Sequence, residues 1–447
     1  MKLLMRLMVF AGIFYALPLS AQTVDLSSLY QKAVEYDAQV RAAKADYLVS
    51  KEEVNKAISQ FRPNVRLSGA RGRNETKSIT PGYYGYTHND QFYNSINYSV
   101  SVQQPLFNLS NYAGYKQAKA VTAKSDAVFQ NEDTNLIVRI TEAYCNALYA
   151  EDNMELSKAH IKASIGQLEQ TKRRREKGYG TITEISEAQA NYDMALADGL
   201  DTANSLEFTR RELEHFTGVY PDALCKLVPE KLVLERPVPD NVDSWIERSR
   251  SMNHQVAAAR EEINIAKTEL QKQRAVRYPT INLVGSRNYS ESDNNYTIGS
   301  SYDTYSVSLQ MSMPIYTGGY VSASVRQALS KRQKAQEQLS WQERGAESDI
   351  RKYYNSIMSS IAQIKGYEQA VKSGEIAFTG TKKGFEAGLR TNTDVLDAEQ
   401  KLLSSKRNLA KSRYQYILSH LQLKATAGTL LPGDVDEVNS WLSVAKK

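Results

Sequence analysis

Cysteine is nearly absent from this sequence of 447 residues, which contains only Cys145 and Cys225. A scaffold held together by several disulfides is therefore excluded, and a single bridge is the most that the chain could form. Cys145 falls inside a helical pattern and Cys225 inside a proline-flanked segment. This placement favours two packed thiols, although it leaves one bridge open.

Long apolar runs are absent beyond the first 21 residues. Lys2 and Arg6 precede a short apolar run at 7–17, and the small residues Ser20 and Ala21 follow it. This order predicts a signal peptide at 1–21 and an exported chain, with no cysteine at the expected cleavage site to carry a lipid. Elsewhere no stretch approaches the roughly 18 continuous apolar residues of a membrane helix. Any membrane crossing by the mature chain would therefore use β-strands.

Strong net charge and catalytic motifs are also absent. The formal net charge is only +6, which is no nucleic-acid signature in a chain of this length. The sequence has no paired-glycine phosphate loop, no histidine or cysteine set at metal-ligand spacing, and no nucleophile turn. It therefore predicts no enzyme, no cofactor and no nucleic-acid partner.

Proline is missing from two long intervals, one between Pro105 and Pro221 and the other between Pro314 and Pro432. Such intervals permit very long helices, because proline breaks a helix interior. Within them, apolar residues recur at every seventh position, which is the spacing of coiled coils. The most regular series is Ile350, Ile357, Ile364, Val371, Phe378 and Phe385.

Each interval predicts one helical hairpin. In the first, a helix runs from about 110 to 177, turns at 178–183 and returns to about 216. A helix of ~65 residues at ~1.5 Å per residue is near 100 Å long, which exceeds a small domain. A plain rod-like coiled coil would share these helices, but the segments between them argue against it.

The chain contains a long internal repeat, in which landmarks recur in the same order. The paired landmarks are Phe61–Gly69 with Arg277–Gly285, Gly178–Ala188 with Gly388–Ala398, and Gly218 with Gly428. A repeat this long is a whole structural unit and not a solenoid element. We therefore expect a first repeat at 22–230 and a second at 231–447, each with a helix, two strands and a long helical hairpin.

Four segments alternate apolar residues with serine, asparagine or glutamine. They begin near Val65, Phe92, Ile281 and Thr304. One apolar and one hydroxyl- or amide-bearing face is typical of a strand between two environments. We expect strands of ~10–13 residues, with polar loops at about 78–90 and 291–301. Tyr83, Tyr84 and Tyr86 in the first loop, with Tyr93, would form an aromatic collar near the outer surface.

Strands of this length can cross a bilayer at a tilt, and their polar face suits a wet lumen. Four strands cannot close on themselves, and open edges are not tolerated in lipid. Neighbouring copies should therefore supply the missing strands, and three copies would give twelve. The proline-rich segment 220–242 and the tail after Leu431 are expected to form a small patch outside the helices.

With this ordered pattern, the chain resembles the TolC family of outer-membrane efflux proteins. The resemblance covers essentially the whole mature chain. It rests on strand starts at Pro63 and Pro279, strand exits at Pro105–Phe107 and Pro314–Gly319, and the turn motif Gly388–Ala398.

The resemblance implies a mainly α fold that assembles as a homotrimer. A twelve-strand barrel would lie in the lipid of a Gram-negative outer membrane, and an α-helical tunnel would cross the periplasm. A periplasmic adaptor and an inner-membrane transporter would be its partners in drug efflux or type I protein secretion. The sequence does not select the cargo, the adaptor or the transporter.

Function in this family concentrates at the hairpin tips. The resemblance makes Gly178, Tyr179, Gly388 and Leu389 the adaptor-docking residues, with Tyr179 in place of the usual leucine. Arg390 would latch the closed state through a bond to Glu184 or to the backbone of Thr183, worth about 1.5–3 kcal/mol. Phe385 stands where the family's gate tyrosine is usual, so one latch bond would be missing.

The resemblance also makes Asp394 and Asp397 the pore-entrance selectivity residues. They lie three apart at the start of a helix and so share a face, and a trimer would turn each into a ring of three anions that favours cations. Acidic residues in the first turn of a helix also interact favourably with the helix dipole, which is an alternative reason for their presence. Thr181 with Glu184 and Thr391 with Asp394 have the spacing of capping boxes.

Two further alternatives remain open from the sequence. The basic run Lys172–Lys177 is either a solvated face or an electrostatic contact with an acidic adaptor. The chain as a whole could be a periplasmic coiled-coil scaffold or adaptor without membrane strands. A passive porin is disfavoured, because over half of the chain has a helical pattern and a porin has strands throughout.

Overall fold

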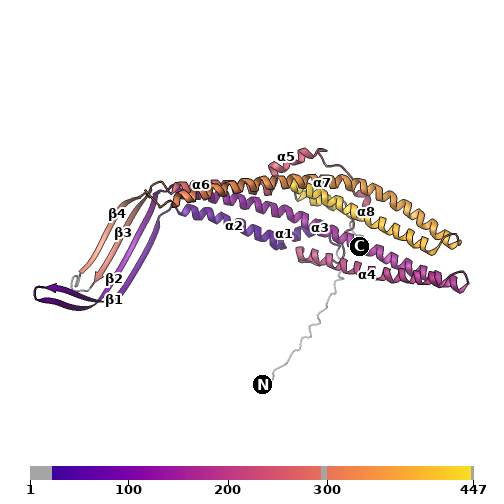
Figure 1. Cartoon of the computed structure of the whole chain (residues 1–447), viewed down its shortest axis with the longest axis horizontal. Coiled ribbons are helices and arrows are strands. Elements are labelled where there is room, and N and C mark those ends of the chain that lie inside the picture. The colour runs from indigo at the N-terminus through magenta and orange to yellow at the C-terminus, as the bar shows by residue number, and fades with distance from the viewer. Residues whose placement is uncertain (1–22, 293–299, 444–447) are drawn as a thin grey trace, which may run out of the picture.

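The computed structural model describes residues 23–292 and 300–443. The molecule is elongated, with a four-stranded sheet at one end and long helices that run from it to two hairpin tips (Figure 1). The expected signal peptide at 1–21 and most of the expected loop at 291–301 lie outside the described residues.

Two long helical hairpins form about half of the chain, as the proline-free intervals predict. The first hairpin consists of α3 (Leu109–Glu176) and α4 (Ile182–Thr217), and the second of α7 (Tyr320–Glu386) and α8 (Asn392–Ala427). The first helix of the first hairpin, α3, lies within one residue of its expected bounds of about 110 and 177. The seven-residue series on α7 begins with Ile350, Ile357 and Ile364, which are at most 1% exposed. These residues therefore form a coiled-coil core.

The four strands form one antiparallel sheet in chain order. They are β1 (Asn64–Gly82), β2 (Gly85–Phe107), β3 (Thr280–Ser292) and β4 (Ser300–Ser312). Two shorter helices, α2 (Ala38–Ser59) and α6 (His254–Ala275), lead into β1 and β3. The order helix, two strands and long hairpin thus occurs twice along the chain.

The register of the sheet places like side chains in the same row. On one face Leu67 lies opposite Val100, and Leu283 lies opposite Leu309. On the other face the rows carry hydroxyl groups, and two pairs of them bond across strands: Ser68 with Ser99 at 2.6 Å, and Ser286 with Ser306 at 2.8 Å. The predicted alternation is therefore confirmed for all four strands.

One ion pair interrupts the apolar face. The Arg287 guanidinium donates two hydrogen bonds to the Asp303 carboxylate, at 3.0 and 2.9 Å. The other apolar side chains are well exposed in the chain, among them Leu67 at 75% and Val307 at 80%. A contiguous apolar face of this kind marks a contact with lipid or protein.

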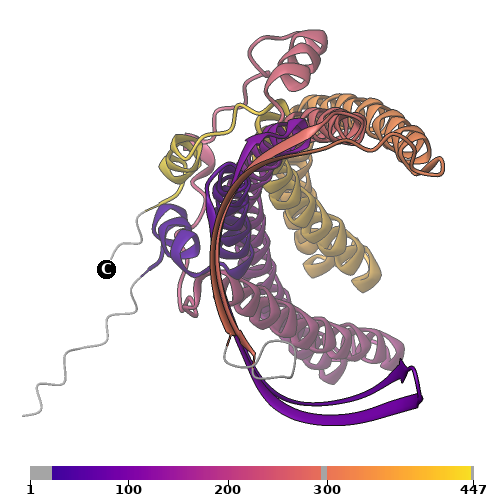
Figure 2. The same ribbon diagram turned by 90° about the vertical axis from the view of Figure 1, so that its left-hand side faces the viewer.

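The predicted loop at 78–90 is wrong. β1 and β2 remain paired from Asn64 with Gln103 up to Gly82 with Gly85, so only Tyr83 and Tyr84 form the turn. The strands have 19 and 23 residues, beyond the expected ~10–13. β3 pairs with β2 no farther out than Ser95. The hairpin 73–94 therefore projects past the rest of the sheet and continues its arc (Figure 2).

A small patch covers the outside of the helices where the two hairpins meet. α1 (Leu26–Tyr36) and α9 (Gly433–Ser440) lie side by side outside the curve of the long helices (Figure 2). The linker contains the 3-10 turn Pro229–Lys231, and it joins the patch through bridges from Leu224 to Val24 and from Leu227 to Leu442. The linker continues into α5 (Val242–Met252). The expected external patch is therefore confirmed.

The main apolar core lies beneath this patch. Leu26, Ile140, Tyr144, Ile357 and Leu421 belong to it, so α1, α3, α7 and α8 share one core.

Cys145 and Cys225 are both buried and free, which confirms the packed thiols. Burial raises the pKa of Cys145 to about 12, so this thiol stays protonated and inert.

Candidate functional site

The two hairpin tips are built by the same local rules. Gly178 and Gly388 follow α3 and α7 in the left-handed conformation, with φ of 83° and 75°. The next residues close Schellman motifs, because Tyr179 N donates to Arg174 O at 2.9 Å and Leu389 N to Gly384 O at 2.8 Å. Each long helix is thereby ended by glycine and turned back on itself.

Both return helices start with a complete capping box. Thr181 accepts from Glu184 N at 3.2 Å, and the Glu184 carboxylate accepts from Thr181 N at 2.9 Å. Thr391 and Asp394 repeat these bonds at 3.1 and 2.9 Å. The predicted capping role is therefore confirmed for both acids.

The four residues that the resemblance assigns to adaptor docking form the tips of the two hairpins, at the end of the molecule opposite the sheet (Figure 1). Gly178 and Tyr179 lie in one turn, and Gly388 and Leu389 in the other. The side chains of Tyr179 and Leu389 are 77% and 82% exposed. Two large apolar side chains held outward on short, rigid turns are suited to a protein contact.

Asp394 and Asp397 both lie in the first turns of α8. Asp397 is exposed and Asp394 is half-buried. The backbone N–H and the hydroxyl of Thr391 hold the pKa of Asp394 below its ordinary value, and the Arg390 charge lowers it further. The capping bonds orient this carboxylate but leave its negative charge in place, so capping and a pore-entrance role are compatible.

Arg390 lies between these acids and the preceding helix. Its stem packs over Gly384, where an added Cβ would come within 2.8 Å of Arg390 Cγ. Within the described part of this single chain, it makes no hydrogen bond to Glu184 or to Thr183. The Glu184 carboxylate is occupied by Thr181 N. An Arg390 latch to either residue would therefore have to form between two copies of the chain.

Phe385 is buried inside the chain, at 2% exposure. The Arg174 guanidinium lies over its ring at 4.3 Å from the centroid, and Arg174 Nη1 donates to its carbonyl oxygen at 2.7 Å. The predicted gate aromatic is thus held by a cation–π contact and a hydrogen bond from the other hairpin.

The sequence gives no reason to distinguish Arg174 from its neighbours in the basic run Lys172–Lys177. Lys172, Arg173, Arg175 and Lys177 are exposed, whereas Arg174 turns inward to the second hairpin. Sequence reasoning also missed the buried pair Gln167 and Asn392. Nothing in the sequence marked these residues, because polar residues seven apart on a coiled-coil helix, such as Gln167 and Arg174, equally form a solvated face.

Sites for other chemistry are not found in the described residues. Within residues 23–292 and 300–443, no three histidine, cysteine, aspartate or glutamate side chains lie close enough together to bind a metal ion. None of the helices described there combines the length and the apolar content that a bilayer-spanning helix requires.

A sheet with one apolar and one hydroxyl-rich face, joined end to end to long helical hairpins, defines an outer-membrane channel with a periplasmic extension. A family model for outer membrane efflux proteins matches residues 29–219 and 245–429. The chain therefore belongs to the outer membrane efflux protein family, which includes TolC.

Relatives and solved structures agree with this assignment. TolC of Vibrio cholerae is 32% identical over 427 residues, which cover 95% of each chain. The alkaline protease secretion protein AprF of Pseudomonas aeruginosa is 31% identical over 411 residues, 92% of this chain and 85% of AprF. The outer membrane protein VceC of Vibrio cholerae has the same fold, with a TM-score of 0.76 and 21% identity over 90% of this chain and 96% of VceC.

Membership of this family places the chain in the outer membrane, extending into the periplasm, as an exit duct for efflux or secretion. Members of the family are channels and not enzymes. The alternative of a periplasmic scaffold without membrane strands is thereby set aside.

Proposed function

We propose that three copies of this chain form one duct that is closed at its helical tips and opens on contact with a periplasmic adaptor. The observation that carries the proposal is the open sheet. β1 and β4 are edge strands of a four-stranded sheet whose apolar face is exposed. An open edge is not tolerated in lipid, and three copies give a closed ring of twelve strands.

The partners follow from this assembly. An adaptor would dock on the exposed turns at Tyr179 and Leu389, and an inner-membrane transporter would deliver the cargo through it. Relatives of this chain include both TolC and a protease secretion protein, so drugs, other small molecules and proteins are all candidate cargo. The transporter, and not the duct, would choose among them.

The closed state would be held by Arg390. In the trimer this cation would reach Glu184 or the Thr183 backbone of the next copy, a charge-assisted bond worth about 1.5–3 kcal/mol. A bond of this strength suits a latch that adaptor binding must release. Asp394 and Asp397 would then present rings of carboxylates at the opening.

Assembly and localisation test the proposal directly. The protein should fractionate with the outer membrane and run as a trimer on gels until it is heated. In planar bilayers it should conduct ions. A correctly inserted protein that remains monomeric would contradict the proposal.

Replacing Arg390 with alanine should raise the single-channel conductance several-fold, because the charge-assisted latch is lost. Lys383→Ala is a matched control, since it removes an exposed cation from the same tip. The control should conduct like the wild type. Equal conductance in Arg390→Ala and Lys383→Ala would count against the latch.

A further inference from the structure

The apolar face of β1 becomes basic at its outer end. Val65, Leu67 and Gly69 are followed on the same face by Arg71 and Arg73, because alternate residues of a strand share a face. We name these two arginines the basic pair. Both are exposed, and neither has a hydrogen bond or an ion pair within the described part of the chain.

Tyrosines mark the outer limit of the apolar face. Tyr98 pairs in register with Tyr289, and Tyr305 lies opposite Arg287. The Tyr98 ring covers Gly69, where an added Cβ would lie 3.0 Å from Tyr98 Cδ1. Aromatic side chains gather at both rims of the apolar band of a membrane barrel. The basic pair therefore begins just beyond the rim that lies farther from the helices.

The other rim lies at Phe107. Its side chain is exposed at the helical end of β2, nine positions from Tyr98. At ~3.4 Å per residue and a tilt of ~40°, these positions rise about 23 Å, close to the ~25 Å of an apolar band. The basic pair is thus level with the headgroups of the outer leaflet, where an arginine on the lipid face costs far less than at the bilayer midplane.

The neighbours of the basic pair leave its charge uncompensated. Its partners in the register on β2 are Ile96 and Asn94, which carry no charge. The next charged residue of the column is Glu75, and its carboxylate lies 3.2 Å from the Lys77 ammonium. Lys77 also lies opposite Asp90 in the register. These acids are therefore balanced by lysine, and the two arginines are not balanced by acids.

The second repeat carries an arginine at the equivalent point, but that arginine is neutralised. Arg287 follows Arg71 by 216 positions, which is the spacing of the repeat at the strand starts. Arg287 donates two hydrogen bonds to Asp303, and Glu291 accepts one from the Tyr289 hydroxyl at 3.0 Å. Only the first repeat therefore presents unpaired arginine at this height.

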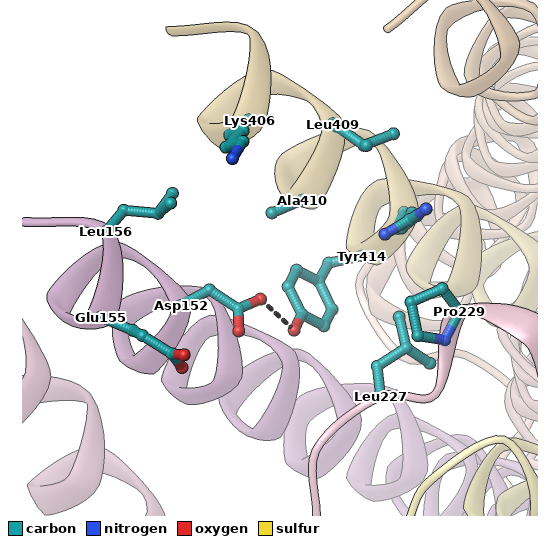
Figure 3. Close-up of a pocket in the computed structure, with 10 residues that line it drawn as sticks. Asp152, Glu155, Leu156, Leu227, Pro229, Lys406, Leu409, Ala410 and Tyr414 are labelled. Atoms are coloured by element: carbon teal, nitrogen blue, oxygen red, sulfur yellow. Dashed lines mark hydrogen bonds between the residues drawn. The ribbon is translucent and has the colours of Figure 1, made fainter. Parts of the chain in front are cut away.

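The cavity between α3 and α8 shows the contrast (Figure 3). Its acids are bound within the chain, because the Tyr414 hydroxyl donates to Asp152 Oδ2 at 2.7 Å and Lys226 Nζ lies 2.5 Å from Glu155. Its cations are bound as well, Lys406 by Glu375 and Arg413 by Glu368. The chain itself satisfies the charges of this cavity, whereas the basic pair needs an external anion.

Phosphate is the anion that fits this position. Arginine binds phosphate through two parallel N–H donors, and two arginines on one face of a strand are ~7 Å apart at their Cα atoms. The outer leaflet of a Gram-negative outer membrane is built on lipid A, a glycolipid whose sugars carry phosphate groups. Such a lipid presents phosphates directly above its acyl chains, as the sheet presents arginines directly above its apolar face.

We propose that the basic pair binds the phosphate groups of lipid A. The acyl chains of the bound lipid lie against Val65 and Leu67, and its phosphates lie against Arg71 and Arg73. The site fixes the depth of the sheet in the membrane. It also places the projecting hairpin 73–94, which continues the arc of the sheet, among the sugars above the lipid (Figure 2). The proposal rests on the barrel of three copies, because that assembly turns the apolar face to lipid.

The double variant Arg71→Gln with Arg73→Gln tests the site. Purified trimers in detergent are titrated with lipid A, and bound lipid is counted by native mass spectrometry. The affinity should fall about tenfold or more, because two charge-assisted contacts are lost. Arg66→Gln is the matched control, since it removes the same charge from the hydroxyl-rich face of the same strand. The control should bind like the wild type, and equal affinity in the two variants would overturn the proposal.

A second measurement needs only the wild-type trimer. Lipid A from which the phosphates have been removed should bind about tenfold more weakly than the phosphorylated lipid. Equal binding of the two lipids would refute the site even if the double variant fails to assemble. Displacement of lipid A by inorganic phosphate, but not by chloride at the same ionic strength, would indicate a site for free anions and not for lipid.

The outcomes also separate this site from the duct. A trimer that conducts ions but does not distinguish the two lipids keeps the duct and removes the lipid site. A protein that stays monomeric in the membrane removes both, because its apolar face then needs another cover. The double variant should conduct like the wild type, since the basic pair lies on the face opposite the lumen.

Discussion

Replacing Gly428 with alanine should largely prevent recovery of the folded trimer. Gly428 ends α8 in the left-handed conformation at φ 73°. An added Cβ would overlap the backbone carbonyl of Met252 and lie 2.9 Å from Asn253 N. The left-handed conformation alone costs a non-glycine residue about 1–2 kcal/mol. The overlap adds to this cost, because Met252 and Asn253 form the rigid junction of α5 and α6 and cannot swing aside.

Alanine variants at two other glycines separate the cost of the left-handed backbone from the cost of the steric overlap. Gly218→Ala has a similar φ of 69°, but the three atoms nearest to the added Cβ all belong to the ring of Tyr36, a half-exposed side chain that can rotate away. It should cost about 1–2 kcal/mol. Gly433→Ala meets nothing within 4 Å and carries no positive φ, so it should be nearly neutral. Thermal melting and trimer yield should rank Gly433→Ala above Gly218→Ala, and Gly428→Ala last. Equal melting of the two positive-φ variants would contradict the packing argument.

The sequence predicts the paired glycines because helix endings are set by local chemistry. Gly218 and Gly428 recur at equivalent points of the repeat, and both take the left-handed cap that glycine allows. The tips are predictable for the same reason. Gly178 and Gly388 end one helix, and threonine three residues before an acid starts the next. The residues that each glycine packs against depend on tertiary structure, so the local sequence does not predict them.

The projecting hairpin at 73–94 shows where periodicity fails. Arg73, Glu75 and Lys77 alternate with other polar residues, so neither face is apolar and the segment has the composition of a loop. Its strands are held by backbone pairing between β1 and β2 up to Gly82 and Gly85. Amphipathic alternation identifies only strands that separate two environments, and this hairpin lies beyond the apolar face of the sheet.

The buried contact between Gln167 and Asn392 could not be predicted for a related reason. Gln167 and Asn392 lie on helices of different hairpins, 225 positions apart in sequence. A buried amide pair carries no compositional signal, since glutamine and asparagine are ordinary residues on a solvated helix face. The internal repeat does not reveal this contact either, because it joins the first repeat to the second and has no equivalent within either repeat.

Replacing both Asp394 and Asp397 with asparagine should remove most of the cation preference of the open duct. Each carboxylate would form a ring of three around the opening, and anionic rings attract cations and repel anions. The ratio of cation to anion permeability, obtained from the reversal potential across a salt gradient, should fall several-fold towards no preference. Glu230→Gln is the matched control, because it removes one exposed carboxylate from the external patch. The control should leave the reversal potential unchanged.

The single variant Asp397→Asn shows whether Asp394 belongs to the ring. With Asp397 neutral, the remaining preference depends on Asp394, whose pKa is lowered by the backbone N–H and hydroxyl of Thr391. A lowered pKa means that the carboxylate stays charged at pH values where an ordinary aspartate, with a pKa of about 3.9, is half protonated. The residual preference should therefore persist to lower pH than that of an ordinary aspartate and disappear only in stronger acid. Its absence at pH 7 would mean that Asp394 serves the helix start alone and does not face the opening.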